Sequence, residues 1–184
     1  MSETFAGREV RTVQPHPGAD NEVGRWLWAM EEVRRGLEGE VAGLDRDRLD
    51  WRGHSGDDNS IGSLLYHIAL IEASWLFEDI LMRPYPEDLI ALFPHDHRTR
   101  DGKLTHVPGV PVSEHLERLR FVRRRFVDLL GPMSRDEWDR VRAPEGVDYA
   151  VSPAWVVFHL VEHEAGHLFE IRAINRRWSS RTAG

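Results

Sequence analysis

The chain has 184 residues, 41% of them hydrophobic, which is enough to bury one core in a single domain. Its formal net charge of −7 argues against a nucleic-acid-binding protein, because such proteins usually carry a basic face. The absence of cysteine excludes disulfide bonds, thiolate metal ligands and a cysteine nucleophile.

The same sequence gives expectations about location and partners. No apolar run approaches the roughly 20 residues of a membrane span, so we expect no membrane partner. The first residues lack the basic and apolar segments of a signal peptide. Together with the absence of cysteine, this favours a cytoplasmic protein.

Residues 1–18 are polar and are interrupted by Pro15 and Pro17. Prolines of this kind break regular structure, and polar chain ends are often loosely held. We therefore expect a flexible N-terminal arm over 1–18, followed by one folded domain over 19–184.

Two long helices are predicted in the first half of this domain. Apolar residues recur at spacings of three and four from Val23 onward, which predicts an amphipathic helix over about 21–44. Ser60 suits an N-cap and Pro84 a stop, which predicts a second helix over about 60–82. That helix has few polar positions, so we expect it to be the most buried.

A long segment, residues 84–111, follows the second helix and contains five prolines. A loop of this length in a compact domain is usually functional or mobile. Its histidines, His95, His97 and His106, could close over a site, but a solvated loop is the interpretation that we favour. A short helical turn is expected at 89–93.

A third helix is predicted over about 113–130 by its apolar periodicity, and Gly131 and Pro132 end it. Its other face is rich in arginine, and we interpret that face as solvated. The arginines concerned are Arg118, Arg120, Arg123, Arg124 and Arg125.

Two further helices complete the chain. Ser134 and Glu137 fit a capping box for a short helix, and Ser152 followed by Pro153 marks the start of a last helix over about 153–178. No convincing strand is found. These elements predict an all-α fold: a four-helix bundle with a long connection between helices 2 and 3 and short extra helices.

Three histidines recur at four-residue intervals on the predicted last helix: His159, His163 and His167. Each step of four returns to nearly the same face of an α-helix, so the imidazoles line one stripe. His67 lies among apolar neighbours in the second helix, where an unpaired imidazole is costly. A divalent metal shared between two helices explains both features, with Zn²⁺ or Ni²⁺ favoured and Fe²⁺ or Mn²⁺ as further candidates.

Two other metal-enzyme patterns overlap this stretch. His163–Glu164–Ala–Gly–His167 matches His-Glu-x-x-His, with Glu164 as general base, but no further histidine follows and no sheet is predicted. Glu164 and His167 also have di-iron spacing, but Glu72 and Glu78 on the second helix have no histidine one turn away. We expect neither a metalloprotease nor a di-iron protein.

The stretches Leu–Leu–Tyr–His67–Ile–Ala and His163–Glu–Ala–Gly–His167–Leu–Phe–Glu resemble the DinB/YfiT-like superfamily of bacterial four-helix bundles. The resemblance runs over residues 23–174. In that family, one histidine of the second helix and a His-x-x-x-His pair of the last helix hold a divalent metal. The resemblance therefore implies His67, His163 and His167 as ligands, and it makes His159 a residue that packs behind them.

The sequence departs from the family pattern directly after the histidine pair, where Leu168, Phe169 and Glu170 replace a common Arg-Gly-Gln. Glu170 lies one turn beyond His167 and could orient that imidazole or take a proton near the metal, which makes it the one catalytic candidate. A surface carboxylate paired with Arg172 or Arg176 is an equally good interpretation.

Three neutral imidazoles would leave a divalent metal with open positions for water or substrate, which is the pattern of catalytic sites. The resemblance implies a metal-dependent transferase of the thiol-S-transferase type, with a low-molecular-weight thiol as a further cofactor, or a hydrolase acting on a small molecule. The alternative is a non-catalytic metal-binding or stress-response module with a structural metal.

A homodimer is expected as well. Bundles of the family that the chain resembles commonly pair through helices, and the seven tryptophans exceed what one core needs. Trp28 and Trp178 are the two that could mark an interface.

Overall fold

The computed structural model describes residues 4–181 of the chain. Four long helices are present: α1 (Asn21–Val41), α3 (Ile61–Ser74), α5 (Val112–Leu130) and α7 (Pro153–Ser180). α3 continues directly into a π-helical segment, η1 (Trp75–Ile80). Three short helices lie in the connections: α2 (Arg46–Asp50), α4 (Glu87–Ile90) and α6 (Arg135–Asp139).

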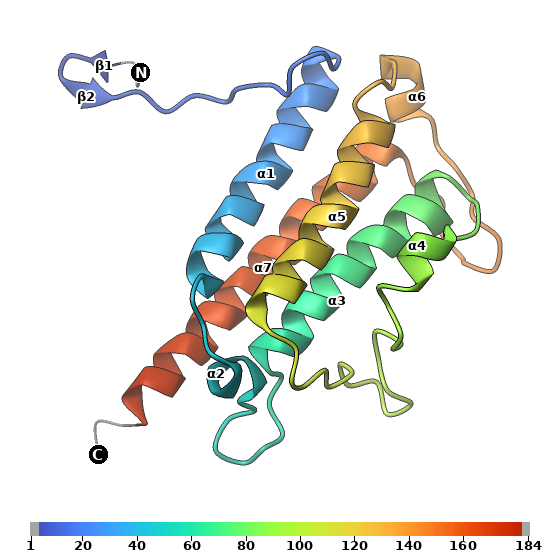
Figure 1. Cartoon of the computed structure of the whole chain (residues 1–184). Coiled ribbons are helices and arrows are strands. Elements are labelled where there is room, and N and C mark those ends of the chain that lie inside the picture. The colour runs from blue at the N-terminus through green and yellow to red at the C-terminus, as the bar shows by residue number, and fades with distance from the viewer. Residues whose placement is uncertain (1–3, 182–184) are drawn as a thin grey trace.

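The four long helices form one bundle (Figure 1). α7 packs along α1 and also contacts α3, and α3 packs along α5. The longest connection joins η1 to α5 and carries α4. The predicted all-α four-helix bundle is therefore confirmed, including its long connection and its short extra helices. None of the described helices is long and apolar enough to cross a membrane.

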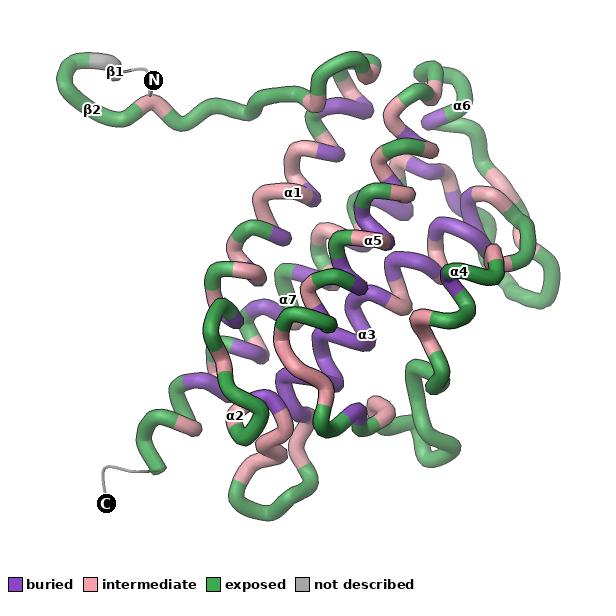
Figure 2. Tube along the Cα trace, in the orientation of Figure 1, coloured by how far each residue is buried: buried purple, intermediate pink, exposed green. Residues whose placement is uncertain are grey.

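Buried residues line the faces that the helices turn toward one another (Figure 2). They form two apolar clusters, one that includes Leu27 and Phe126 and another that includes Leu65 and Ile171. α3 is buried around almost its whole circumference, since every residue from Ile61 to Ala69 is buried. The apolar composition of this segment predicted that placement, and it puts His67 inside the bundle.

Side-chain caps fix where the helices begin. Ser60 caps α3 and Ser152 caps α7, and each accepts a hydrogen bond from the backbone N–H three residues later. At α6, Ser134 and Glu137 form the predicted capping box. Each cap satisfies a backbone donor that the helix itself leaves free, which is why the helix starts could be predicted.

The predicted helix over 60–82 is regular only as far as Ser74, where η1 begins. In its last turn the N–H of Leu81 donates to the carbonyl oxygen of Leu76, five residues back, at 2.9 Å. Asp79 within η1 is 5% exposed and accepts a hydrogen bond from the Tyr149 hydroxyl at 2.9 Å. Desolvation raises the pKa of Asp79 above its usual value, against the effect of that hydrogen bond. Tyr149 lies far from Asp79 in the sequence, so periodicity could not reveal this contact.

The N-terminal arm carries a small hairpin that the sequence did not predict. β1 (Thr4–Phe5) and β2 (Arg8–Glu9) pair in antiparallel fashion around a turn whose two residues both have positive φ. Figure 1 shows the hairpin extending away from the bundle, and the chain joins α1 through a hydrogen bond from the His16 N–H to the Gly24 carbonyl oxygen. Residues 1–3 and 182–184 lie outside the described residues, and the flexibility of the arm stays a prediction.

The predicted solvated basic face of α5 is wrong for Arg118 and Arg123, which are 7% and 5% exposed. Arg118 donates from Nε to the carbonyl oxygen of Leu92 at 3.0 Å, and Arg123 binds Glu72 on α3 at 2.6 Å. A guanidinium can be buried where its N–H groups meet oxygen acceptors. Those acceptors lie on other elements, so the pattern along α5 alone could not show them.

The homodimer stays a prediction. Trp28 and Trp178 are each partly buried within the chain, and Trp178 packs edge to face against Trp51 with ring centres 5.7 Å apart. The most exposed aromatic side chains lie on α7, namely Phe169 at 67% and Trp155 and Phe158 at 46% each. Sedimentation velocity at micromolar concentration should show a two-chain species, and a monomer would contradict the prediction.

Candidate metal centre

Three histidines meet between α3 and α7. His67 lies on α3, and His163 and His167 lie one turn apart on α7. The Nε2 atom of His163 is 3.2 Å from that of His67 and 3.2 Å from that of His167. One ligand atom of each ring lies within 4.8 Å of the other two. The fold therefore brings together the three residues that the sequence suggested as ligands.

This convergence fits a divalent cation better than it fits hydrogen bonding. For tetrahedral ligands with Zn–N bonds of about 2.0–2.1 Å, neighbouring nitrogens are roughly 3.3–3.4 Å apart. The separations here, 3.2 Å, are close to that. A neutral imidazole has one N–H and one lone pair, so three nitrogens that face one another cannot all be satisfied by hydrogen bonds. The buried Nδ1 of His67 also has no hydrogen-bond partner among the described residues.

Burial keeps two of these imidazoles neutral. Desolvation, reinforced by the neighbouring His163 and His167, lowers the pKa of His67 to about 3. Desolvation, reinforced by His167 and His159, likewise lowers the pKa of His163 to about 3. Both rings therefore present a free lone pair at neutral pH, and protons compete with a metal less than they would at an exposed imidazole.

Acid is expected to destabilise the metal-free protein. The pKa values of His67 and His163, about 3, lie below the value of about 6.5 that histidine has in an unfolded chain. Between these values the unfolded chain binds more protons, so the free energy of unfolding falls as the pH falls. Desolvation lowers the pKa of buried His115 to about 4, which acts in the same direction. Urea unfolding at about pH 7 and about pH 4.5 measures this, and equal midpoints would contradict the burial of neutral imidazoles.

Glu170 orients one ring of the triad. Its Oε2 lies 3.2 Å from Nδ1 of His167, and its Oε1 accepts a hydrogen bond from Asn59 at 2.9 Å. This contact favours the proton on Nδ1 and leaves the Nε2 lone pair directed toward the other histidines. The hydrogen bond from His167 holds the pKa of Glu170 below its usual value, against the opposing effect of burial. The surface pairing that we also considered is not formed by Arg172, which lies against Glu40 at 3.4 Å.

His159 lies outside the group of three nitrogens. Its ring stacks on Trp155 with centres 5.3 Å apart and packs edge-on against Trp75 at 5.2 Å. The ring centre is 6.1 Å from that of His163. The imidazole therefore forms part of an aromatic wall beside the triad.

The long connection before α5 is tethered next to the triad. The hydroxyl of Tyr66 donates to the carbonyl oxygen of His95 at 2.6 Å and accepts from its N–H at 2.9 Å. The exposed ring of His97 then lies 6.2 Å from the ring of His67. The solvated-loop interpretation is right about the exposure of these histidines, but it missed the tether, since no local pattern links Tyr66 to a loop that follows much later.

Glu164, the general base that a metalloprotease would require, is committed elsewhere. It is 3% exposed, and it accepts hydrogen bonds from Arg34 at 2.6 Å and from Arg123 at 2.9 Å. The same two guanidiniums bind Glu72 at 2.7 Å and 2.6 Å. Four buried charges from four helices thus form one closed ion-pair network. Glu164 and Glu72, which the metalloprotease and di-iron patterns would use, therefore face arginines and not the histidine triad.

This network links the two helices that carry the histidines, because Glu72 follows His67 on α3 and Glu164 adjoins His163 on α7. Burial alone would raise the pKa of Glu72, but the nearby guanidiniums hold it below its usual value. The burial of Arg34 in this network was not predicted from the sequence, although Arg34 occupies a position of the apolar stripe of α1. An arginine within such a stripe is the signal that could have revealed the network.

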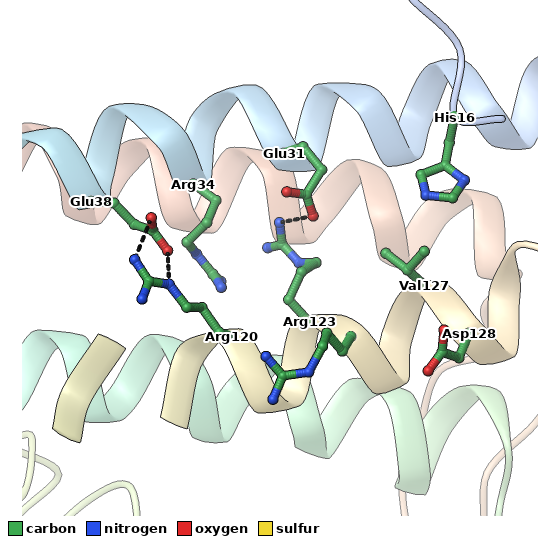
Figure 3. A pocket seen from close by; sticks show the side chains of 9 residues that line it. His16, Glu31, Arg34, Glu38, Arg120, Arg123, Val127 and Asp128 are labelled. Carbon is green, nitrogen blue, oxygen red and sulfur yellow. Dashed lines mark hydrogen bonds and ion pairs between the residues drawn. The ribbon is translucent and has the colours of Figure 1, made fainter. Parts of the chain in front are cut away.

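The outer side of the network opens into a pocket of about 290 Å³ between α1 and α5 (Figure 3). Arg120 binds Glu38 there at 2.9 Å, and Arg123 reaches Glu31 at 3.5 Å. Of the four arginines that line it, Arg34, Arg120 and Arg123 are paired with carboxylates, and Asp128 in the same lining offsets the charge of Arg124, so this pocket is a poor anion site. The histidine triad remains the candidate for chemistry.

The sequence and the fold are both similar to those of known proteins. A model of the DinB superfamily matches residues 29–171. Among solved structures, YfiT from Bacillus subtilis matches with a TM-score of 0.57 and 20% sequence identity, over 90% of this chain and 93% of that chain. That protein is described as a probable metal-dependent hydrolase with an unusual four-helix bundle topology. Among curated proteins, none matches. The family model covers most of the chain, including all three histidines of the triad, so this protein belongs to the DinB superfamily.

Proposed function

We propose that this protein is a divalent-metal-dependent enzyme that acts on a small molecule, with His67, His163 and His167 as the metal ligands. The observation that carries the proposal is the convergence of the three rings: the Nε2 atom of His163 lies 3.2 Å from the Nε2 atoms of both His67 and His167, and the three ligand atoms lie within 4.8 Å of one another. A cation held there would supply Lewis acidity to a water molecule or to a substrate oxygen. Hydrolysis is the reaction class that we favour, and the description of YfiT as a probable metal-dependent hydrolase supports it.

The protein's own residues would prepare the site for such chemistry. Glu170 fixes the orientation and tautomer of His167 through their 3.2 Å contact. The burial of His67 maintains a neutral ligand and keeps solvent from its inner side. His97 on the tethered connection lies beside the triad and would contact a substrate that approaches from solvent. The positive charge of the next residue, Arg98, contributes to the lowered pKa of His67.

A thiol-S-transferase is the second candidate, and a pocket beside the triad favours it. The pocket has a volume of about 250 Å³ and includes Ser63, which lies one turn before His67 on α3. Basic side chains line it, together with two aspartates: Arg52, Arg98, Lys103 and His106. These basic side chains would bind the carboxylates of a low-molecular-weight thiol by donating hydrogen bonds to them. A thiol cofactor also suits a chain that has no cysteine of its own.

Product analysis with metal-loaded protein separates the two reactions. Protein loaded with Zn²⁺, Ni²⁺, Mn²⁺ or Fe²⁺ is incubated with small esters and amides, and separately with an epoxide or quinone plus a low-molecular-weight thiol. If the esters or amides are turned over without thiol, and this turnover is lost in His163→Ala, the result supports the hydrolase. If only the epoxide or quinone is turned over, and only when the thiol is present, the result supports the transferase. Absence of both reactions in a protein that binds metal stoichiometrically would overturn the enzyme proposal in favour of a non-catalytic module.

Removal of the metal is expected to leave the helices intact. The two apolar clusters of the bundle do not depend on the triad, so burial of apolar surface should maintain the fold. A chelator should therefore lower the melting temperature, through linkage between metal binding and folding, without loss of the helical circular dichroism. Loss of the helical signal at neutral pH would show that the metal is structural, and it would contradict the open-site enzyme.

A further inference from the structure

A pocket runs along α3 away from the triad. Its volume is about 290 Å³, near the lower end of the range for small-molecule sites. Leu70 and Ile71 of α3 form one side, and Leu89 and Phe93 of the long connection form the other. These four side chains give the pocket an apolar middle.

One end of this pocket lies toward His67, although none of the three histidines lines it. Leu70 follows His67 by about one helical turn, and His97, whose ring lies 6.2 Å from the ring of His67, also lines the pocket. The tether between Tyr66 and His95 holds this wall against α3. A molecule that fills the pocket therefore has one end beside the three histidines.

The other end carries a carboxylate. Glu78 of η1 lines the pocket and accepts a hydrogen bond from the Ser74 hydroxyl at 2.6 Å, which fixes its position. It forms no ion pair with any residue between 4 and 181. The pocket lining over the same residues includes Asp96 but neither lysine nor arginine. Glu78 lies about three turns beyond His67, roughly 16 Å along the helix.

We propose that this pocket binds the substrate of the triad, and that this substrate is an elongated apolar molecule with an amino group at the end remote from the reacting group. The inference rests on the proposed metal site and deepens it by naming a substrate class. The apolar middle of the substrate lies on Leu70 and Ile71, and its ammonium group meets Glu78. A positioned carboxylate without a cation of its own selects an amine over a neutral or anionic end.

Calorimetric titration of the zinc-loaded protein tests this with two hydroxamates of equal chain length. Hydroxamates coordinate zinc, and the two compounds differ only in a terminal amine or methyl group. The amine should bind about fivefold more tightly, as expected for one partly exposed ion pair, and high salt should reduce the preference. Glu78→Gln should abolish the preference. Glu117→Gln removes the same charge from an exposed position on α5 outside the pocket, and it should retain the preference.

Other outcomes separate this inference from the metal site itself. Equal affinity for the two compounds, or a preference that survives Glu78→Gln, would overturn the substrate class and leave the metal site standing. Failure of both compounds to bind the zinc-loaded protein would overturn the open metal site instead. Ile71→Trp, which fills the pocket, should weaken both long hydroxamates but not acetohydroxamate, and unchanged binding of the long compounds would place their chains elsewhere.

Discussion

Replacement of Arg123 by methionine is expected to lower the free energy of unfolding by about 3–5 kcal/mol. The buried guanidinium donates to Glu72 at 2.6 and 3.0 Å and to Glu164 at 2.9 Å. Methionine fills much of the same space but has no donor, so two buried carboxylates lose a partner. Urea denaturation at neutral pH measures the difference.

Arg120→Met is the matched control for this prediction. Arg120 lies on the same helix and binds Glu38 with two hydrogen bonds, at 2.9 and 3.0 Å, but half of its side chain is exposed. An exposed ion pair of this kind contributes about 0–1 kcal/mol. If Arg123→Met lowers the free energy of unfolding no more than Arg120→Met does, the result would contradict the view that the buried network stabilises the bundle.

Replacement of His67, His163 or His167 by alanine is expected to abolish stoichiometric metal binding in each case. The three ligand atoms lie within 4.8 Å of one another, and two remaining imidazoles would leave a cation too few protein ligands. Equilibrium dialysis followed by elemental analysis measures this, on protein purified without a metal-affinity column.

His159→Ala is the control on the same helix stripe, one turn before His163. Its ring centre is 6.1 Å from that of His163, and it stacks on Trp155, so its loss should weaken metal binding without abolishing it. Loss equal to that of the other three variants would mean that the assignment of His163 and His167 as the ligand pair on α7 is wrong.

Features encoded by local spacing could be predicted from the sequence. The interval between His163 and His167 sets both rings on one face of α7, and the cap at Ser60 together with the apolar run after it places His67 inside the bundle. The resemblance to the DinB/YfiT-like family then selected this trio over His159. The structure brings the three rings together.

Features that depend on contacts between distant segments could not be predicted. Arg123 follows Leu119 by four residues and precedes Phe126 by three, which places it on the buried stripe of α5, but only the packing of α3 and α7 against it supplies Glu72 and Glu164. The tether at Tyr66 likewise depends on a partner elsewhere in the chain, and the apolar periodicity over 60–82 did not distinguish the π-helical segment η1 from an α-helix. Periodicity along one helix contains no information about such partners.

Anomalous diffraction at the zinc edge, from crystals of the zinc-loaded protein, tests the central claim most directly. We expect one strong peak about 2.0–2.1 Å from the Nε2 atoms of His67, His163 and His167, with solvent in the remaining coordination positions of the zinc ion. A peak elsewhere in the molecule, or a fourth protein ligand that closes the coordination sphere, would contradict it.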